Sequence, residues 1–457
     1  MVRRTACRAM QDRTENFMSL QIRRVLTVGV AVAALTGSIA GAQAGSFQLR
    51  EQSASAMGQG FAGVAAGVGG LSSMWWNPAT ITDNPGWQSS WSLTGIAPNS
   101  TTTTGVGTFA PFTGPTFSNS SGNIGQGAIL PASYSSYQFN DRLWLGLATG
   151  APFGLVTKNN PHWSGGFYGQ TSKVFSTDIS PTIGYKVNEW LSVAVGAQIE
   201  YFKARLTSLR PPTFATTTVF EGDSWGLGYT LGVTLKPFAG TEIGIGYRSQ
   251  VRQGLKGSLQ NAFGLPAFVA IRSTLTLPDE LTIGVQQKIT DKLSLSAGFE
   301  WTHWSLFKSF PVTSAASGAT ITSLGFRYRD GWFASVGGAY QWNDALTLRA
   351  GLGYEKSPIP DAVRGVRLTD NDRVWTSIGA GYKVNSKLSF DVSYAHAFVK
   401  ASPITITSLA NPAFNPLLPV PYVGRNKTSL DIVSVGLNYR WDDPGVTAPA
   451  GPIVRKY

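Results

Sequence analysis

Cysteine and histidine are scarce in this chain, and their scarcity excludes several kinds of chemistry. The 457 residues include one cysteine, Cys7, and three histidines. Cys7 precedes the cleavage site expected after Ala44, so the mature chain has no thiol for a disulfide, a metal-thiolate site or a nucleophile. The histidines lie far apart and match no metal-ligand spacing: His162, His303 and His396. We therefore expect no metal and no cofactor.

Charge and long apolar runs are also lacking. Charged residues make up 14% of the chain and hydrophobic residues 42%, whereas charged residues are about 25% of an average protein. No stretch of the mature chain approaches the roughly 20 apolar residues that a membrane-spanning helix needs. This combination argues against both an ordinary soluble protein and a helical membrane protein. It suits β-strands with one face in lipid and the other in a wet lumen.

The sequence instead alternates apolar residues with small or polar ones. In the segment 346–354, Leu346, Leu348 and Leu352 share one strand face, whereas Arg349 lies on the other. Because a barrel in lipid is apolar outside and polar inside, this pattern predicts an all-β, transmembrane antiparallel β-barrel. The expected strands number fourteen: 86–97, 126–139, 142–150, 172–187, 190–207, 223–236, 241–252, 272–288, 292–305, 327–342, 345–355, 371–384, 387–400 and 428–441.

The connections between these strands alternate in length. Short turns, most with Asn or Asp, are expected at 140–141, 188–189, 237–240, 290–291, 343–344 and 385–386. Long polar loops separate them: 98–125, 151–171, 208–222, 253–271, 306–326, 356–370 and 401–427. Short periplasmic turns and long outer loops are typical of outer-membrane barrels, so we expect the cell outer membrane of a Gram-negative bacterium. Any single segment would also fit a soluble β-sandwich.

Residues 1–44 have the features of a secretory signal peptide. Arg23 and Arg24 precede the apolar run 25–40, and a small-x-small site ends at Ala44. Removing the six basic and two acidic residues of this segment reduces the formal net charge from +12 to +8. No basic run with interleaved aromatics accompanies the charge, so we expect no nucleic-acid partner. The excess favours anionic lipopolysaccharide or an anionic ligand.

Several motifs together carry a family resemblance. The mature chain begins Gly45-Ser-Phe-Gln-Leu-Arg-Glu-Gln-Ser53, and Asn77-Pro78-Ala79 follows. Later come Trp301-Thr-His-Trp-Ser305, Gly351-Leu-Gly-Tyr-Glu-Lys-Ser-Pro-Ile-Pro360 and Asp370-Asn-Asp-Arg-Val-Trp375. Together these segments resemble the FadL-type long-chain fatty acid / hydrocarbon outer-membrane transporter family.

The resemblance implies four parts of the chain. After the signal peptide, residues 45–85 would form an N-terminal hatch (plug), which is too small to bury a core alone. Residues 86–441 would form the transmembrane β-barrel around it, and 442–457 a C-terminal periplasmic extension. The expected protein is a monomer surrounded by outer-membrane lipid and lipopolysaccharide, and inserted by the barrel-assembly machinery.

The resemblance also implies a route for long-chain fatty acids or other hydrophobic small molecules. Apolar residues of an outer loop would capture the ligand: Phe263, Leu265 and Phe268. A binding site inside the barrel would hold it, and release would follow sideways through a kink in the third strand. The candidate kink residues are Gly150, Pro152 and Gly154, because proline and glycine interrupt a ladder. The alternative is that 151–154 simply begins the outer loop.

Candidate ligand-binding residues come from three places. The hatch offers Phe47, and its uncharged run offers Met74, Trp75 and Trp76. An equally good interpretation of the last three is that they only pack the plug against the barrel wall. The hatch motif itself is Asn77, Pro78 and Ala79. A carboxylate would need a basic partner. Arg327 and Arg329 are an odd number of positions from Trp332, whose side chain is expected to face lipid, so alternation along the strand (strand parity) directs both arginines inward. The family also suggests Lys203, although parity directs that side chain outward.

Several other functions are alternatives to transport of fatty acids. Neutral aromatic or aliphatic hydrocarbons would follow the same route, and an open diffusion porin would lack the hatch. The segment 58–63 fits G-x-G-x-x-G and 222–226 fits G-x-S-x-G, but neither has the strand and helix context that the chemistry requires. A Ser/His pair at the barrel rim is the remaining enzymatic alternative. We expect that the chain is not an enzyme.

Overall fold

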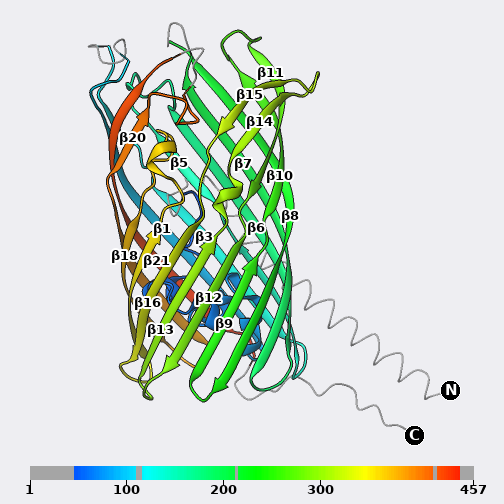
Figure 1. The fold of residues 1–457 in the computed structure, drawn as a ribbon. Coiled ribbons are helices and arrows are strands. Elements are labelled where there is room, and N and C mark those ends of the chain that lie inside the picture. The colour runs from blue at the N-terminus through cyan, green and yellow to red at the C-terminus, as the bar shows by residue number, and fades with distance from the viewer. Residues whose placement is uncertain (1–45, 110–115, 211–214, 415–418, 443–457) are drawn as a thin grey trace, which may run out of the picture. The chain divides into compact units, whose positions relative to one another are not determined.

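The computed structural model describes residues 46–109, 116–210, 215–414 and 419–442. The predicted signal peptide, its cleavage site and residues 443–457 of the predicted extension lie outside these ranges. The described part is a closed antiparallel barrel of fourteen strands, as the alternation predicts (Figure 1). Its last strand pairs with its first, beginning with Gln88 opposite Arg440, so the sheet closes on itself.

The fourteen strands are neighbours in chain order around the barrel. They are β1 (Trp87–Thr104), β3 (Ala128–Gln138), β4 (Leu143–Gly150), β6 (Thr171–Lys186), β7 (Leu191–Leu209), β8 (Thr217–Phe238), β9 (Thr241–Arg248), β12 (Glu280–Lys288), β13 (Leu293–Thr302), β16 (Gly331–Gln341), β17 (Leu346–Lys356), β18 (Arg373–Lys383), β19 (Leu388–Val399) and β21 (Tyr422–Arg440).

Additional strands extend the wall at the long-loop end. They are β2 (Ser120–Asn123), β5 (Gly154–Lys158), β10 (Val251–Gln260), β11 (Phe268–Leu277), β14 (Ser309–Ser314), β15 (Thr320–Gly325) and β20 (Ser402–Ile406). The apolar alternation predicts loops over most of these segments. The apolar alternation stops where the outer face leaves lipid, but the backbone ladder continues, for example between β8 and β10. Apolar periodicity therefore underestimates strand length above the membrane.

The short turns are closed by side chains of the predicted kind. The Asn188 Oδ1 atom accepts hydrogen bonds from the backbone N–H groups of Trp190 and Leu191, at 3.0 and 2.9 Å. Asn140, Asn343 and Asn385 make the same pair of bonds. An Asn side chain that mimics a backbone turn in this way fixes the register of the two strands it joins.

The two faces of the wall differ as the barrel interpretation requires. On β21, Ile432 and Ser434 are fully buried, whereas Val433 and Val435 on the other face are about half exposed. Exposed aromatic side chains, such as Trp190 and Trp342, lie near the short turns, where membrane-water interfaces collect them. Among the described residues, no helix has the length and hydrophobicity to cross a membrane.

Residues 46–85 form short helices inside the barrel, in its short-turn half (blue in Figure 1). The helices are α2 (Ala54–Gly58), η1 (Val64–Ala66), η2 (Gly70–Trp75) and η3 (Pro78–Asp83). Two further short helices, η5 (Trp304–Leu306) and η6 (Asp361–Val363), belong to the outer loops. We call residues 46–85 the hatch from here on.

Two glycines of β9 allow the hatch backbone to touch the wall. A Cβ atom added at Gly244 would lie 1.7 Å from the carbonyl oxygen of Ala65, and one at Gly246 would lie 1.8 Å from that of Trp76. Neither separation is possible for real atoms. The close approach of hatch and wall therefore requires glycine at both positions.

Candidate functional site

The wall is interrupted where the third strand leaves the membrane region. The strand β4 ends at Gly150 and β5 begins at Gly154, and both pair with β6. Gly150 lies opposite Asp178 and Gly154 opposite Phe175. Between these pairs, the three residues 151–153 face the two residues 176–177 of β6. The interruption is a β-bulge with Pro152 at its centre.

The neighbouring strand does not close this interruption. The ladder between β3 and β4 covers only Ser133–Gln138 of β3. Among the described pairings, residues 128–132 of β3 pair with β1 and have no partner on β4 or β5. We call this unpaired stretch of wall, with residues 151–153 beside it, the wall break.

The start of the hatch fills the wall break. The Leu49 N–H donates to the Pro152 carbonyl at 2.8 Å, and the Gly154 N–H donates to the Phe47 carbonyl at the same distance. The Gln52 side chain donates to the Ala151 carbonyl at 2.7 Å. The hatch therefore supplies the backbone partner that a neighbouring strand would otherwise give.

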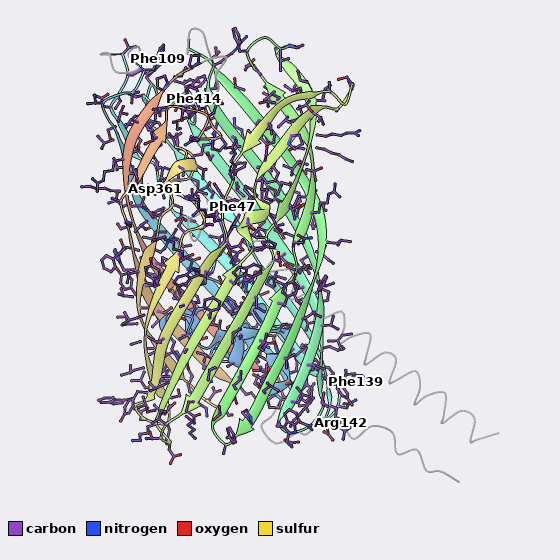
Figure 2. The ribbon with its side chains drawn as sticks, viewed as in Figure 1. Phe47, Phe109, Phe139, Arg142, Asp361 and Phe414 are labelled. Atoms are coloured by element: carbon purple, nitrogen blue, oxygen red, sulfur yellow. The ribbon has the colours of Figure 1, made fainter. Side chains whose placement is uncertain are left out.

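An aromatic cluster lies above the wall break, inside the barrel. The Phe47 ring is 5.7 Å from that of Phe153, 4.8 Å from Trp304 and 5.4 Å from Phe307, measured between ring centroids. Figure 2 shows Phe47 at mid-height, between the long-loop end marked by Phe109 and the short-turn end marked by Arg142. We call these residues and those packed on them the interior apolar cluster: Leu155, Val174, Phe202, Phe310, Tyr328 and Leu368 among others.

Ion pairs hold the two ends of the hatch to the barrel. Arg50 contacts Glu300 at 2.5 Å and Glu355 at 3.3 Å, and all three side chains are buried. At the other end, Asp83 contacts Lys236 at 2.5 Å. The run 63–76 in the middle of the hatch is uncharged, so these ion pairs with the barrel lie towards its two ends. Removing one partner of a buried pair costs about 3–5 kcal/mol, so the Arg50 contacts are strong restraints.

The Asn-Pro-Ala motif connects the middle of the hatch to the wall. The Asn77 side-chain amide donates to the carbonyl of Val233 on β8 at 2.9 Å and to that of Ala65 at 2.7 Å. Its oxygen accepts the Ala79 N–H at 3.0 Å, which caps η3, and Pro78 occupies the first turn. Asparagine thus caps a helix and tethers it with one side chain.

Met74, Trp75 and Trp76 are buried between hatch and wall, each at most 3% exposed. The guanidinium of Arg248, which pairs with Asp178, lies 4.2 Å from the Trp75 ring centroid. These contacts are those of packing and cation–π attraction.

The structure does not gather the three predicted cations around a ligand site. Arg327 and Arg329 are both exposed, while Tyr328 between them is buried in the interior apolar cluster. The parity argument fails because β16 begins only at Gly331 and Arg327 has a φ of 54°, which breaks the alternation. Lys203 lies on the outer face and contacts Glu221 at 2.8 Å, as its parity indicates.

Arg367 is the cation that the sequence reading missed. It follows η6 and lies against the upper ends of β6 and β7, where its Nη1 donates to the carbonyls of Thr207 at 2.9 Å and Thr171 at 3.3 Å, and to the Ser172 hydroxyl at 3.4 Å. No acidic side chain pairs with it among the described residues. Burial lowers the pKa of Arg367 to about 10, so it stays charged at neutral pH.

This guanidinium lies at the edge of the interior apolar cluster. Its sequence neighbour Leu368 belongs to the cluster, as do Val174 of β6 and Leu206 of β7 just below the bonded residues. Towards the part of the chain that the structure describes, Arg367 donates hydrogen bonds from Nη1 alone, which leaves Nε and Nη2 as further donors. A partly buried cation without an acid favours an anionic ligand.

The predicted outer capture residues lie on and beside the loop between β10 and β11. Phe263 and Phe268 are more than half exposed, whereas Leu265 packs against the interior apolar cluster. Exposed aromatic side chains at an outer loop are suited to contact an apolar solute.

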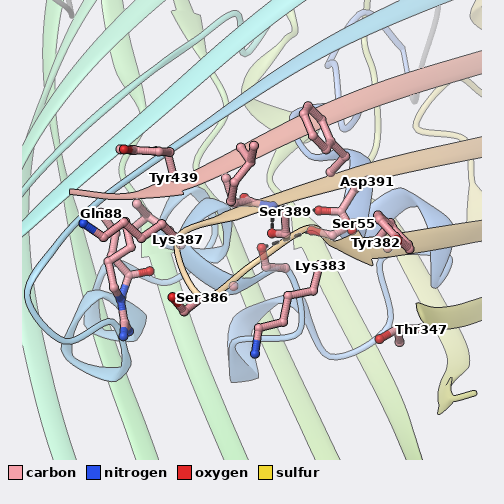
Figure 3. Close-up of a pocket in the computed structure, with 18 of the residues that line it drawn as sticks. Ser55, Gln88, Thr347, Tyr382, Lys383, Ser386, Lys387, Ser389, Asp391 and Tyr439 are labelled. Atoms are coloured by element: carbon pink, nitrogen blue, oxygen red, sulfur yellow. Dashed lines mark hydrogen bonds between the residues drawn. The ribbon is translucent and has the colours of Figure 1, made fainter. Parts of the chain in front are cut away.

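A separate cavity of about 930 Å³ lies between the hatch and the short-turn end of the barrel (Figure 3). Its lining is polar: Arg349 donates to Asp391 at 2.7 Å and Asn438 donates to the same carboxylate at 2.8 Å. Lys383 and Lys387 of a short turn also line it. This cavity suits water and ions, and an apolar ligand would gain nothing from it. No group of His, Cys, Asp or Glu side chains suited to a metal ion occurs in the described ranges.

The residues missed by sequence reasoning belong mainly to long-range contacts. Phe153, the pair Trp304 and Phe307, and Arg367 come from three different loops and meet only in the fold. The one local signal is the aromatic content of 304–328, most of which (306–326) the alternation predicts to be a loop.

Comparison with known proteins gives consistent matches over most of the chain. Residues 34–441 match the model of the family described as outer membrane protein transport protein (OMPP1/FadL/TodX). The 47 kDa outer membrane protein of Pasteurella multocida is 28% identical over 442 residues, which cover 90% of this chain and 97% of that protein. The long-chain fatty acid transport protein of Escherichia coli K12 is 25% identical over 427 residues, covering 83% and 92%.

Two solved structures show the same fold. A Pseudomonas aeruginosa FadL homologue superposes with a TM-score of 0.77 at 22% identity, covering 87% of this chain and all of that one. The Ralstonia pickettii toluene transporter TbuX gives a TM-score of 0.62 at 18% identity, covering 85% and 99%. At these identities the likeness supports the architecture alone.

Proposed function

This chain belongs to the OMPP1/FadL/TodX family of outer-membrane transport proteins, and we propose that its cargo is long-chain fatty acids. As a member of that family it is a Gram-negative outer-membrane transporter of hydrophobic compounds. We infer that it is not an enzyme. In the proposed route, the outer loops capture the acid, the interior apolar cluster binds it, and the wall break releases it sideways into the membrane.

The observation that carries this proposal is the contact between the hatch start and the wall break. Phe47 belongs to the interior apolar cluster, and its own carbonyl accepts the Gly154 N–H. A ligand that displaces Phe47 from the cluster would therefore also loosen residues 47–49 from the wall. Binding and opening would be linked through one short segment, and an apolar solute would avoid the polar cavity below the hatch.

Arg367 supports an acid as the cargo. A fatty acid has one charged group, and a carboxylate in an apolar interior needs a cationic partner. Arg367 offers that partner at the upper edge of the cluster. The second candidate is a neutral hydrocarbon, which the uncharged aromatic surface of the cluster would also accept, and TbuX is described as a toluene transporter.

Replacing Arg367 distinguishes the two cargoes. We expect Arg367→Gln to weaken oleate binding about tenfold or more, because a hydrogen bond to a charged group contributes roughly 1.5–3 kcal/mol. Toluene binding should not change, because it has no carboxylate. The measurement is the affinity of the purified barrel for each ligand, by fluorescence displacement or calorimetry.

The matched control is the double variant Arg327→Gln, Arg329→Gln, which removes two other cations of the outer half. It should bind oleate like the unchanged protein. Loss of oleate affinity in this variant and not in Arg367→Gln would place the carboxylate near residues 327–329. Equal oleate binding by all variants, with strong toluene binding, would favour the neutral cargo.

A further inference from the structure

Six cations and two acids form a patch on the outer face of the barrel, at its long-loop end. They lie on five neighbouring strands, β6, β7, β8, β10 and β11, which Figure 1 draws side by side. We call the following residues the basic patch: Lys173, Lys203, Arg205, Glu221, Asp223, Arg252, Lys256 and Arg272. They point outward, since the residues that alternate with them, such as Phe202, Ala204 and Leu255, are buried inside.

The basic patch lies just above the hydrocarbon region of the membrane. Tyr201 on β7 follows Trp190 at a short turn by eleven positions, and a strand tilted by about 40° climbs roughly 2.5 Å per residue. This span of roughly 28 Å matches the apolar band of about 25 Å on such barrels. The Tyr201 and Trp225 rings, 5.2 Å apart, mark its upper edge. Lys203 follows Tyr201 by two residues.

Below this edge the same strands are strongly apolar. Trp225 is 62% exposed and Leu227, the next outward residue toward the periplasm, is 75% exposed. Acyl chains can therefore lie against β7 and β8 while a headgroup reaches the cations above. Aromatic side chains are favoured at such a boundary.

The charges of the basic patch are not balanced by the protein. Glu221 contacts Lys203 at 2.8 Å and Arg205 at 3.6 Å. Lys173, Arg252, Lys256 and Arg272 form no ion pair among the described residues. Lys256 lies directly opposite Arg272 in the β10–β11 ladder, and opposite Asp223, without an ion pair between the two described side chains, in the β8–β10 ladder. The two acids therefore leave four of the six positive charges of the patch unbalanced. The like charges of Lys256 and Arg272, in opposite positions, destabilise the sheet, and an anion bound between them would offset that cost.

We propose that the basic patch binds the phosphate groups of lipid A, the phosphorylated glycolipid of the outer leaflet. A phosphate between Lys256 and Arg272 would remove their repulsion, and Arg252, nearer the lipid edge, would contact a second one. Lysine and arginine bind phosphate oxygens through charge-assisted hydrogen bonds. The acyl chains would lie on the exposed surface of Trp225 and Leu227. This interaction is independent of the cargo that passes through the barrel.

The test compares lipid A with and without its phosphates. The triple variant Arg252→Gln, Lys256→Gln, Arg272→Gln should bind diphosphorylated lipid A about 100-fold more weakly than the unchanged barrel, if each cation contributes as juxtamembrane cations do. The full mature protein is reconstituted in nanodiscs of neutral lipid and titrated by native mass spectrometry. Lipid A stripped of phosphate should bind both proteins equally weakly, and EDTA should have no effect on either result.

The matched control removes the same charge at the periplasmic end: Lys288→Gln, Lys292→Gln, Lys383→Gln. It should bind lipid A like the unchanged barrel, and heat-modified gel migration confirms that both variants fold. Wild-type-like binding of lipid A by the Arg252 triple variant would overturn the proposal. So would equal binding of phosphatidylglycerol and lipid A by the unchanged barrel. Reduced oleate uptake with unchanged lipid A binding would assign the patch to cargo instead.

Discussion

A disulfide between Gln48→Cys and Phe153→Cys is expected to abolish fatty acid uptake, and a reducing agent should restore it. The one cysteine of the chain, Cys7, lies in the predicted signal peptide, so the engineered pair would supply the only thiols of the predicted mature protein. In the proposed mechanism the hatch start has to leave the wall break before the ligand can pass. A covalent link between the two would hold the break closed.

The geometry of this pair favours the bond. Residues 48 and 153 face each other in an antiparallel bridge, and the hydrogen bonds on either side run from Leu49 to Pro152 and from Gly154 to Phe47. This is the non-hydrogen-bonded type of pair, whose Cα atoms are about 4.5 Å apart. Disulfides span Cα separations of roughly 4.4–6.8 Å.

The measurement is uptake of labelled oleate by cells that carry the variant, before and after reduction. Each single cysteine variant serves as a control, because it carries the same loss of packing without the link. Full uptake in the oxidised protein, with the disulfide confirmed by mass spectrometry, would show that the wall break is not the exit. A loss that reduction does not reverse would point to packing at Phe153.

The second large effect is expected from Gly246→Leu. Its side chain would occupy the position of the Trp76 carbonyl, 1.8 Å from the ideal Cβ. The strand β9 is held by hydrogen-bonded pairing with β8 on one side and β12 on the other. Because β9 cannot move away, we expect the hatch to move. We expect the variant to conduct ions with large, steady currents, because an unplugged barrel of this size leaves an aqueous channel. Planar-bilayer recording measures this directly.

Gly254→Leu on β10 is the matched control. No atom lies within 4 Å of a Cβ built at Gly254, so the same substitution meets open space there. This variant should keep the low conductance of the plugged barrel. If the Gly246→Leu barrel folds and still has low ion conductance, the hatch has relaxed around the new side chain without leaving its place.

Local chemistry was enough to predict the barrel. Strand number and the sidedness of the loops follow from alternation and from turn residues such as Asn188, which act within a few residues of themselves. The same reasoning placed Lys203 outside. It failed for Arg329, because parity was extended beyond the true start of β16 at Gly331.

The interior site could not be predicted in the same way. Arg367 and Phe153 belong to loops, where no periodicity indicates direction. Two partners of Phe47 are distant along the chain: Phe153 is more than one hundred residues away and Trp304 more than two hundred. Similarly, the glycines of β9 look like any others in a glycine-rich sequence until the hatch backbone is seen against them.

The sequence by itself thus determined a fourteen-stranded outer-membrane barrel with an apolar outer face, because strand faces and turns depend on neighbouring residues. Only the tertiary structure decided where that wall is interrupted, which hatch residues fill the interruption, and which cation lies beside the interior apolar cluster. These features depend on contacts between distant segments, and a linear pattern carries no information about which loops meet inside a closed barrel.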